Sequence, residues 1–201
     1  MNVKTTNRRK VLAVLAGGLV LGVGTAVTLA AWNDSEFATG TFTAGAFNLE
    51  GSTTSATAGF AEHPDESTAA AIAFTAGFDN IAPEDVVYAP FWVRLDATTT
   101  DPATLTANAP TSTGANAANL SYDVYSIGAA AACDETATSG TLVASGTDLT
   151  GFAAGSGVSL AAGPAPAAGA AAQLCFVVTA GSDLVESGAA TATWSFTAES
   201  N

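Results

Sequence analysis

From residue 41 onward the chain consists of short stretches of alternating apolar and polar residues, separated by clusters of Gly, Ser, Asn, Asp and Pro. A period of two residues predicts β-strands with one buried face. The alternation is clearest in residues 190–198 (ATATWSFTA), where apolar side chains fall on one face and hydroxyl side chains on the other. Residues 173–181 (QLCFVVTAG) are largely apolar on both faces, which predicts a central strand.

Other stretches complete the predicted fold. In residues 89–100 we expect Phe91, Val93 and Leu95 on one face and Trp92, Arg94 and Asp96 on the other, with either face buried. In residues 120–125 the even-numbered side chains are expected on one face and the odd-numbered ones on the other. Further candidate strands lie at residues 41–51, 69–78, 141–146 and 157–162. About eight short strands with no helical period predict an all-β fold, an antiparallel β-sandwich.

The first 30 residues have the composition of a secretory signal peptide. Four of the five basic residues precede an apolar run from Val11 to Leu29, which ends in small residues. Cleavage is expected between Ala30 and Ala31. The alternative is a retained membrane anchor, because the run approaches the roughly 20 residues that span a bilayer. We therefore predict a signal peptide (1–30), an N-terminal segment (31–40) and one β-sandwich domain (41–201).

The charge of the remaining chain narrows the possible partners. All 18 acidic residues lie at Asp34 or later, and Arg94 is the only basic residue beyond residue 30, so this part has a net charge of −17. A surface of this charge repels nucleic acids and anionic membranes. We expect neither as a partner of the processed protein.

Cys133 and Cys175 are the only cysteines. An even number in an exported chain predicts one disulfide, and two buried free thiols are the alternative. The two residues do not form a C-x-x-C pair, so a redox or zinc function has almost no support.

The chain lacks recognisable catalytic motifs. With His63 as its sole histidine it offers neither a His-rich zinc site nor a convincing catalytic triad, and no phosphate-binding loop precedes a helix. Residues 62–67 (EHPDES) gather three carboxylates that could hold a calcium ion, although a solvated acidic turn is the simpler interpretation. We therefore expect a protein that is not an enzyme and that uses no cofactor.

Two segments resemble the TasA/camelysin proteins of Gram-positive bacteria, whose precursors are cut by a SipW-type signal peptidase. Ala31, Trp32, Asn33 and Asp34 match the first part of the family's export signature, and residues 41–49 (TFTAGAFNL) match the second. Residues 78–85 (FDNIAPED) are similar to a further family motif, with Glu84 where that motif has glycine. The turn after Pro83 therefore lacks the residue that best tolerates positive φ. The cysteine pair and the closing strand are similar to shorter, Ala-rich members from actinobacteria.

The resemblance implies a jelly-roll-like sandwich that is secreted and serves as a structural protein of the cell surface or biofilm matrix. Family fibres self-associate by donor-strand complementation, in which the N-terminal segment of one subunit completes a sheet of the next. Residues 31–40 are the candidate donor, with Trp32, Asn33, Asp34 and Phe37 as candidate pairing residues. The alternative is that this segment starts a strand of its own domain or frays. The metallopeptidase activity ascribed to camelysin relatives is not expected, because matching zinc ligands are absent from the sequence.

A second functional hypothesis is a monomeric adhesin or polysaccharide-binding module. Exposed Tyr88, Trp92 or Tyr125 would then provide a surface for stacking. Packing in the core is the alternative interpretation of each of these aromatic residues.

Overall fold

The computed structural model describes residues 3–26, 35–41, 44–75 and 77–201. The chain divides into two compact units, residues 1–43 and residues 44–201. The first contains helix α1 (Val3–Ala26). In the described part of the chain, no helix combines the length and the hydropathy needed to cross a membrane.

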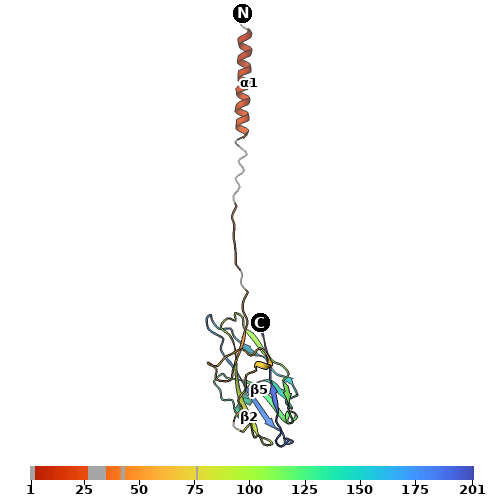
Figure 1. Cartoon of the computed structure of the whole chain (residues 1–201). Helices are drawn as coiled ribbons and strands as arrows, with labels where there is room; N and C mark the ends of the chain where they lie inside the picture. Colours follow the sequence, from red (N-terminus) through yellow and green to blue (C-terminus); the bar gives the residue numbers. More distant parts are fainter. Residues whose placement is uncertain (1–2, 27–34, 42–43, 76) are drawn as a thin grey trace. The chain divides into compact units, whose positions relative to one another are not determined.

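The second unit is built from antiparallel strands, of which β2 and β5 are labelled in Figure 1. The main sheet has the order β1 (Leu49–Ser52), β2 (Val86–Leu95), β9 (Ala172–Ala180), β5 (Leu120–Ile127), β6 (Thr141–Gly146) and β7 (Ala153–Ala154). A three-stranded sheet has the order β11 (Phe196–Ser200), β3 (Ala103–Ala107) and β8 (Val158–Leu160), and β10 (Thr191–Thr193) pairs with β4 (Thr111–Thr113). Along the chain, strands alternate between the two sheets: β2, β5 and β9 lie in the main sheet, and β3, β8 and β11 lie in the three-stranded sheet. This arrangement confirms the all-β, jelly-roll-like sandwich.

The two small ladders continue one another. Phe196 lies opposite Ala107 in the first ladder, and Thr193 lies opposite Thr111 in the second, so one extra residue is inserted on the β3–β4 side. The predicted strand 190–198 is therefore divided at Trp194 and Ser195. Its apolar side chains still face the core on both sides of this break.

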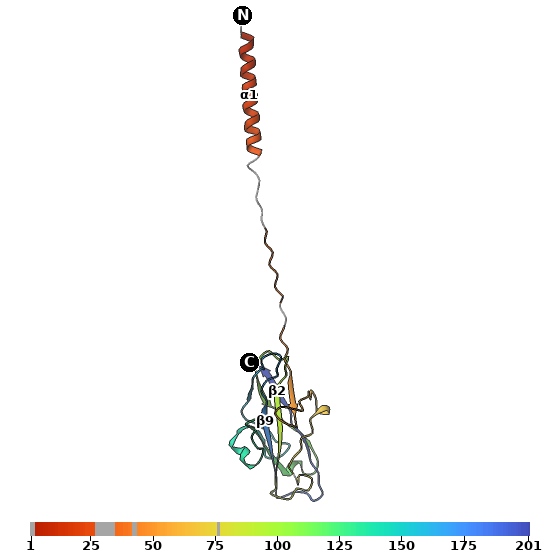
Figure 2. The ribbon, with the colours of Figure 1, turned by 90° about the vertical axis from the view of Figure 1, so that its left-hand side faces the viewer.

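The core lies between the sheets and confirms the predicted faces. Val93 and Leu95 of β2 are buried in it together with Tyr122 and Val124 of β5. Strand β9 lies beside β2 (Figure 2) and has β5 as its other neighbour in the sheet, and its residues 173–178 are buried without interruption. It is buried on both faces because a loop covers the side of the main sheet that points away from the core.

This loop, residues 128–140, is called the flap here. It contains the short 3₁₀ helix η3 (Glu135–Ser139), and the predicted disulfide between Cys133 and Cys175 joins it to β9. The indole nitrogen of Trp92 donates to the Ala129 carbonyl at 2.9 Å. The amide nitrogen of buried Gln173, in its hydrogen-bonding orientation, faces the carbonyls of Gly128, Ala129 and Ala131 at 3.0, 3.1 and 3.2 Å.

Two strand predictions are wrong in their extent. Residues 69–75 form no strand, although Ile72 and Phe74 pack against the core as the alternation suggested. The alternation therefore reflects two side chains anchored between the sheets. The backbone of this segment makes a single hydrogen bond to the main sheet, from Thr75 N–H to the Tyr88 carbonyl at 2.8 Å, so it forms no ladder. In residues 41–51 the strand begins only at Leu49.

The turn after Pro83 adopts the backbone for which the resembled motif uses glycine. Glu84 has a φ of 69°, and the Asp85 N–H donates to the Ala82 carbonyl at 3.1 Å. Proline at the second position and positive φ at the third define a type II turn. The Ala82 N–H also donates to the Asp85 carboxylate at 2.8 Å, which stabilises the turn without glycine.

Candidate functional site

The N-terminal segment is described from residue 35 to residue 41. These residues are exposed and form neither helix nor strand, and Phe37 is 96% exposed. A phenylalanine this exposed is a suitable anchor for a partner surface. The other predicted pairing residues, Trp32, Asn33 and Asp34, lie outside the described residues, as does the predicted cleavage point between Ala30 and Ala31.

The sandwich has a cleft of about 590 Å³ where its two sheets end, at the β1 edge of the main sheet. Residues 49–51 of β1 form one wall, and residues 192–196 of the β10–β11 region form another. Core side chains reach into it, among them Phe91, Val93, Phe176, Trp194 and Phe196. Polar groups such as Glu50 and Thr111 also line the cleft, and its volume lies within the range of ligand-binding pockets. We call it the edge cleft.

Trp194 lines the edge cleft and carries a buried hydrogen-bond donor that is not satisfied. Its ring packs against Tyr122 and Phe176, at centroid distances of 5.6 and 5.0 Å. Its indole nitrogen is buried and has no hydrogen-bond partner in the described part of the chain. Because a buried donor without an acceptor costs about 1–3 kcal/mol, an incoming carbonyl oxygen would stabilise this site.

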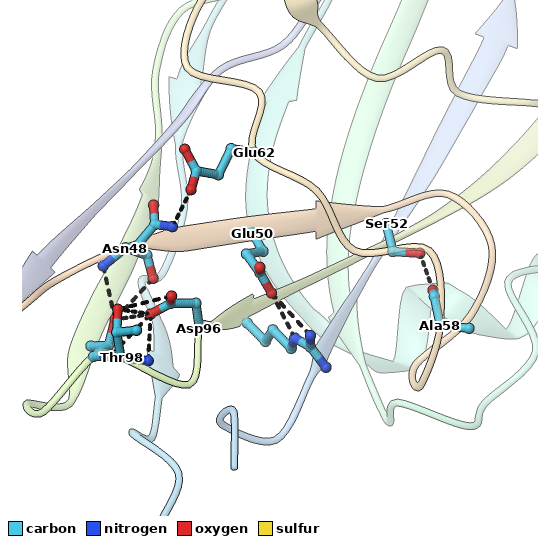
Figure 3. Close-up of polar contacts among 9 residues, drawn as sticks. Asn48, Glu50, Ser52, Ala58, Glu62, Asp96 and Thr98 are labelled. Carbon is cyan, nitrogen blue, oxygen red and sulfur yellow. Dashed lines mark hydrogen bonds and ion pairs between the residues drawn. The ribbon is translucent and has the colours of Figure 1, made fainter. Parts of the chain in front are cut away.

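Residues 62–75, which we call the strap, cross the edge cleft between the sheets. Glu62 accepts a hydrogen bond from the Asn48 side chain, next to β1, at 2.6 Å (Figure 3). Glu66 accepts one from the Thr111 hydroxyl, in β4, at 2.7 Å. The strap therefore has one carboxylate contact on each side of the sandwich, and its apolar contacts come from Ile72 and Phe74.

Strand β1 is held mainly from its β2 side. Glu50 and Arg94 lie opposite one another and form an ion pair at 3.0 Å, drawn as dashed lines from Glu50 in Figure 3. The Arg94 guanidinium lies 3.9 Å from the centre of the Phe60 ring. On its other edge, β1 forms an isolated bridge between Gly51 and Ala61. Most of this edge is therefore not engaged in a ladder with another named strand.

The three carboxylates of residues 62–67 make separate contacts and do not converge on one point. The described residues contain no group of three or more acidic, His or Cys side chains placed to hold a metal ion. Glu62 and Glu66 contact different sides of the sandwich, whereas Asp65 caps η1 (Glu66–Thr68). A hydrogen bond from the Ser67 hydroxyl lowers the pKa of Asp65. The geometry favours the acidic-turn interpretation over a calcium site.

The three aromatic residues of the adhesin hypothesis share the outer face of the main sheet. Trp92 is occupied by the flap, since its indole nitrogen is bonded to Ala129. Tyr88 and Tyr125 are half-buried and pack against Cys175 and Val177. Sequence reasoning did not single out Asp123, which lies on the same face. In the sequence it is marked only as a polar position of an alternating strand.

The fold and the edge cleft define the class of this protein as an acidic, disulfide-linked β-sandwich with an exposed N-terminal segment. Comparisons with protein-family models and with characterised proteins found no match for the chain. Its function is therefore inferred from its residues and geometry.

Proposed function

We propose that this protein is an exported structural protein of the cell surface or extracellular matrix, and that its copies assemble into filaments by donor-strand complementation. The observation that carries the proposal is the edge cleft, an opening that core side chains line between the sheets, together with the buried, unpaired N–H of Trp194. The donor is the N-terminal segment of a neighbouring copy. Its described residues 35–41 form no strand of their own.

Donor-strand addition would fill the edge cleft and provide an acceptor for the Trp194 N–H. The backbone of a donated segment supplies carbonyl oxygens, and its alternate side chains fill pockets along the sheet edge. We assign Phe37 as one anchor, which would exchange its exposed position for the aromatic lining of the edge cleft. A contact of this kind does not close on itself, so repeated addition gives an open filament.

Export is the second part of the proposal. It is supported by the basic and apolar start of the chain, by the cysteine pair and by the resemblance to SipW-processed precursors. Cleavage between Ala30 and Ala31 by a SipW-type signal peptidase would free the donor segment. The processed chain then carries a net charge of −17, which keeps copies apart until acid or salt reduces their repulsion.

The test compares two chains by electron microscopy, one starting at Ala31 and one lacking residues 31–37. We expect filaments from the first at low pH or high salt and none from the second. Phe37→Ala should weaken assembly, whereas Phe152→Ala, which truncates another exposed phenylalanine, should not. Filaments unchanged by the deletion would rule out donor-strand assembly.

A further inference from the structure

The outer face of the main sheet carries a row of side chains away from the edge cleft. Tyr88 lies opposite Val177, and Val177 lies opposite Asp123, across strands β2, β9 and β5. Tyr125 follows two residues after Asp123 on the same face of β5. We call Tyr88, Asp123 and Tyr125, which surround the buried Val177, the tyrosine face.

Asp123 differs from the loop aspartates of the sandwich. Asp65, Asp134 and Asp148 each accept hydrogen bonds from a nearby hydroxyl and backbone N–H. Asp123 is the one aspartate within the described strands, and its carboxylate has no hydrogen-bond donor among the described residues. Its surroundings raise its pKa through burial. A partly desolvated acceptor without a donor needs a donor from outside the chain.

Within the described sandwich, Asp123 has no ion-pair partner. Arg94, the only basic residue beyond residue 30, is paired with Glu50 on β1. The side-chain oxygens of Asp123, Tyr88 and Tyr125 have no hydrogen-bond partner among the described residues and are not fully buried, so they are open to solvent or to a ligand. The pKa of Tyr125 is raised by burial and by the negative charge of Asp123.

We propose that the tyrosine face binds a neutral polysaccharide. Sugar hydroxyls supply the donors that the Asp123 carboxylate lacks, while sugar C–H groups pack on the electron-rich ring faces of Tyr88 and Tyr125. Anionic glycans are disfavoured by the net charge of −17.

The geometry of a sheet face favours a saccharide chain over a small organic cation. Strands β2 and β5 are separated by one strand, which places their backbones about 10 Å apart. Tyr88 and Tyr125 pack against Val177 on one face of the sheet, whereas a quaternary ammonium ion is bound by a box of aromatic rings that encloses it. The two rings can contact successive parts of one extended chain.

The test uses the purified full chain in affinity electrophoresis and calorimetry with a soluble β-glucan, a mannan and a xylan. Polygalacturonate and choline serve as anionic and cationic probes. We expect at least one neutral polysaccharide to bind. Tyr88→Ala and Tyr125→Ala should each lower the affinity at least tenfold, Tyr88→Phe and Tyr125→Phe should largely retain it, and Asp123→Asn should lower it severalfold. Phe152→Ala is the matched control and should leave it unchanged.

Three results would overturn the proposal: no neutral polysaccharide binds, choline or polygalacturonate alone binds, or binding is unaffected by all of the substitutions in the tyrosine face. Near-ultraviolet circular dichroism checks that the alanine variants are folded, and Asp123→Asn preserves the shape of the side chain. Binding is measured separately from filament assembly, so variants that lose the polysaccharide but still form filaments distinguish this proposal from the proposed function.

Discussion

The flap and the strap are two irregular segments that cover the same sandwich, and they are held in different ways. The flap is joined to β9 by the Cys133–Cys175 disulfide and faces the buried amide of Gln173 and the indole of Trp92. The strap has two carboxylate contacts at solvent-exposed positions and two half-buried apolar side chains, Ile72 and Phe74. Each segment contains a short 3₁₀ helix capped by an aspartate, Asp134 in the flap and Asp65 in the strap.

The difference indicates which side of the sandwich can open. Segments with few buried contacts open at a lower free energy than segments fixed by a covalent bond and buried polar groups. A donor strand has to displace or share space with the strap to enter the edge cleft. The weak attachment of the strap therefore agrees with the proposed acceptor site, whereas the flap is fixed to the outer face of the main sheet at Trp92, Gln173 and Cys175.

The largest expected effect comes from removing the disulfide. Replacing Cys133 and Cys175 together by alanine releases a link between residues 42 apart in sequence and should lower the free energy of unfolding by about 2–5 kcal/mol. Urea denaturation of the oxidised protein and of the double variant measures this change. A loss below about 1 kcal/mol would show that the flap does not depend on the covalent link, and the comparison with the strap would fail.

The next effect tests the buried amide. Gln173→Ala leaves the carbonyls of Gly128, Ala129 and Ala131 without this donor and should lower the free energy of unfolding by about 1–3 kcal/mol. Trp92→Phe is the companion variant, since it removes one hydrogen bond to Ala129, and should cost about 1 kcal/mol. Equal stability of wild type and Gln173→Ala in urea would show that the amide does not hold the flap.

Much of this fold could be predicted from sequence where burial follows local alternation. Strands β2, β5 and β9 and the β10–β11 region have their faces as expected, because each places its apolar side chains on a face that the core covers. Residues 69–75 have the same alternation but form no strand, because strand formation also needs a backbone partner, which the local sequence does not specify.

The candidate site was less accessible to sequence reasoning. Phe37 could be singled out from the chain, and it is exposed, while its part in subunit pairing stays a prediction. The edge cleft joins residues about 140 positions apart, from β1 to Trp194, and alternation predicted Trp194 only as a core residue. The partners of Gln173 and Trp92 are backbone carbonyls in an Ala-rich loop, which carry no sequence signal.

A smaller effect is expected from the strap. Phe74→Ala removes one of its two apolar anchors and should cost about 1–2 kcal/mol, less than for a fully buried phenylalanine. It should also raise the fluorescence of a dye that binds apolar surface, because the edge cleft becomes more open. Phe78→Ala is the control, since this exposed ring lies 6.3 Å from Phe74 and should change neither reading appreciably. An unchanged dye signal in Phe74→Ala would show that Phe74 does not keep the strap in place.

The smallest effect is expected from acid, which acts on both caps. In the folded chain, hydrogen bonds hold the carboxyl pKa values of Asp65 and Asp134 below 3.8. The largest contribution comes from the Ser67 side chain for Asp65 and from the Thr136 side chain for Asp134. A lowered pKa contributes stability that is present above 3.8 and is lost as the pH falls through the folded value, so the melting temperature should fall below about pH 4.

The strap and the flap should respond differently to this loss. The disulfide retains the flap when Asp134 is protonated, whereas protonation of Asp65 leaves the strap with its apolar contacts, so dye binding at the edge cleft should rise before circular dichroism reports unfolding. Asp123 acts in the opposite direction, because burial raises its pKa and its protonation in acid relieves a destabilising charge. Asp123→Asn should therefore be more stable than wild type at pH 7 and lose stability more steeply in acid. Dye binding that rises only together with unfolding would mean that acid does not release the strap first.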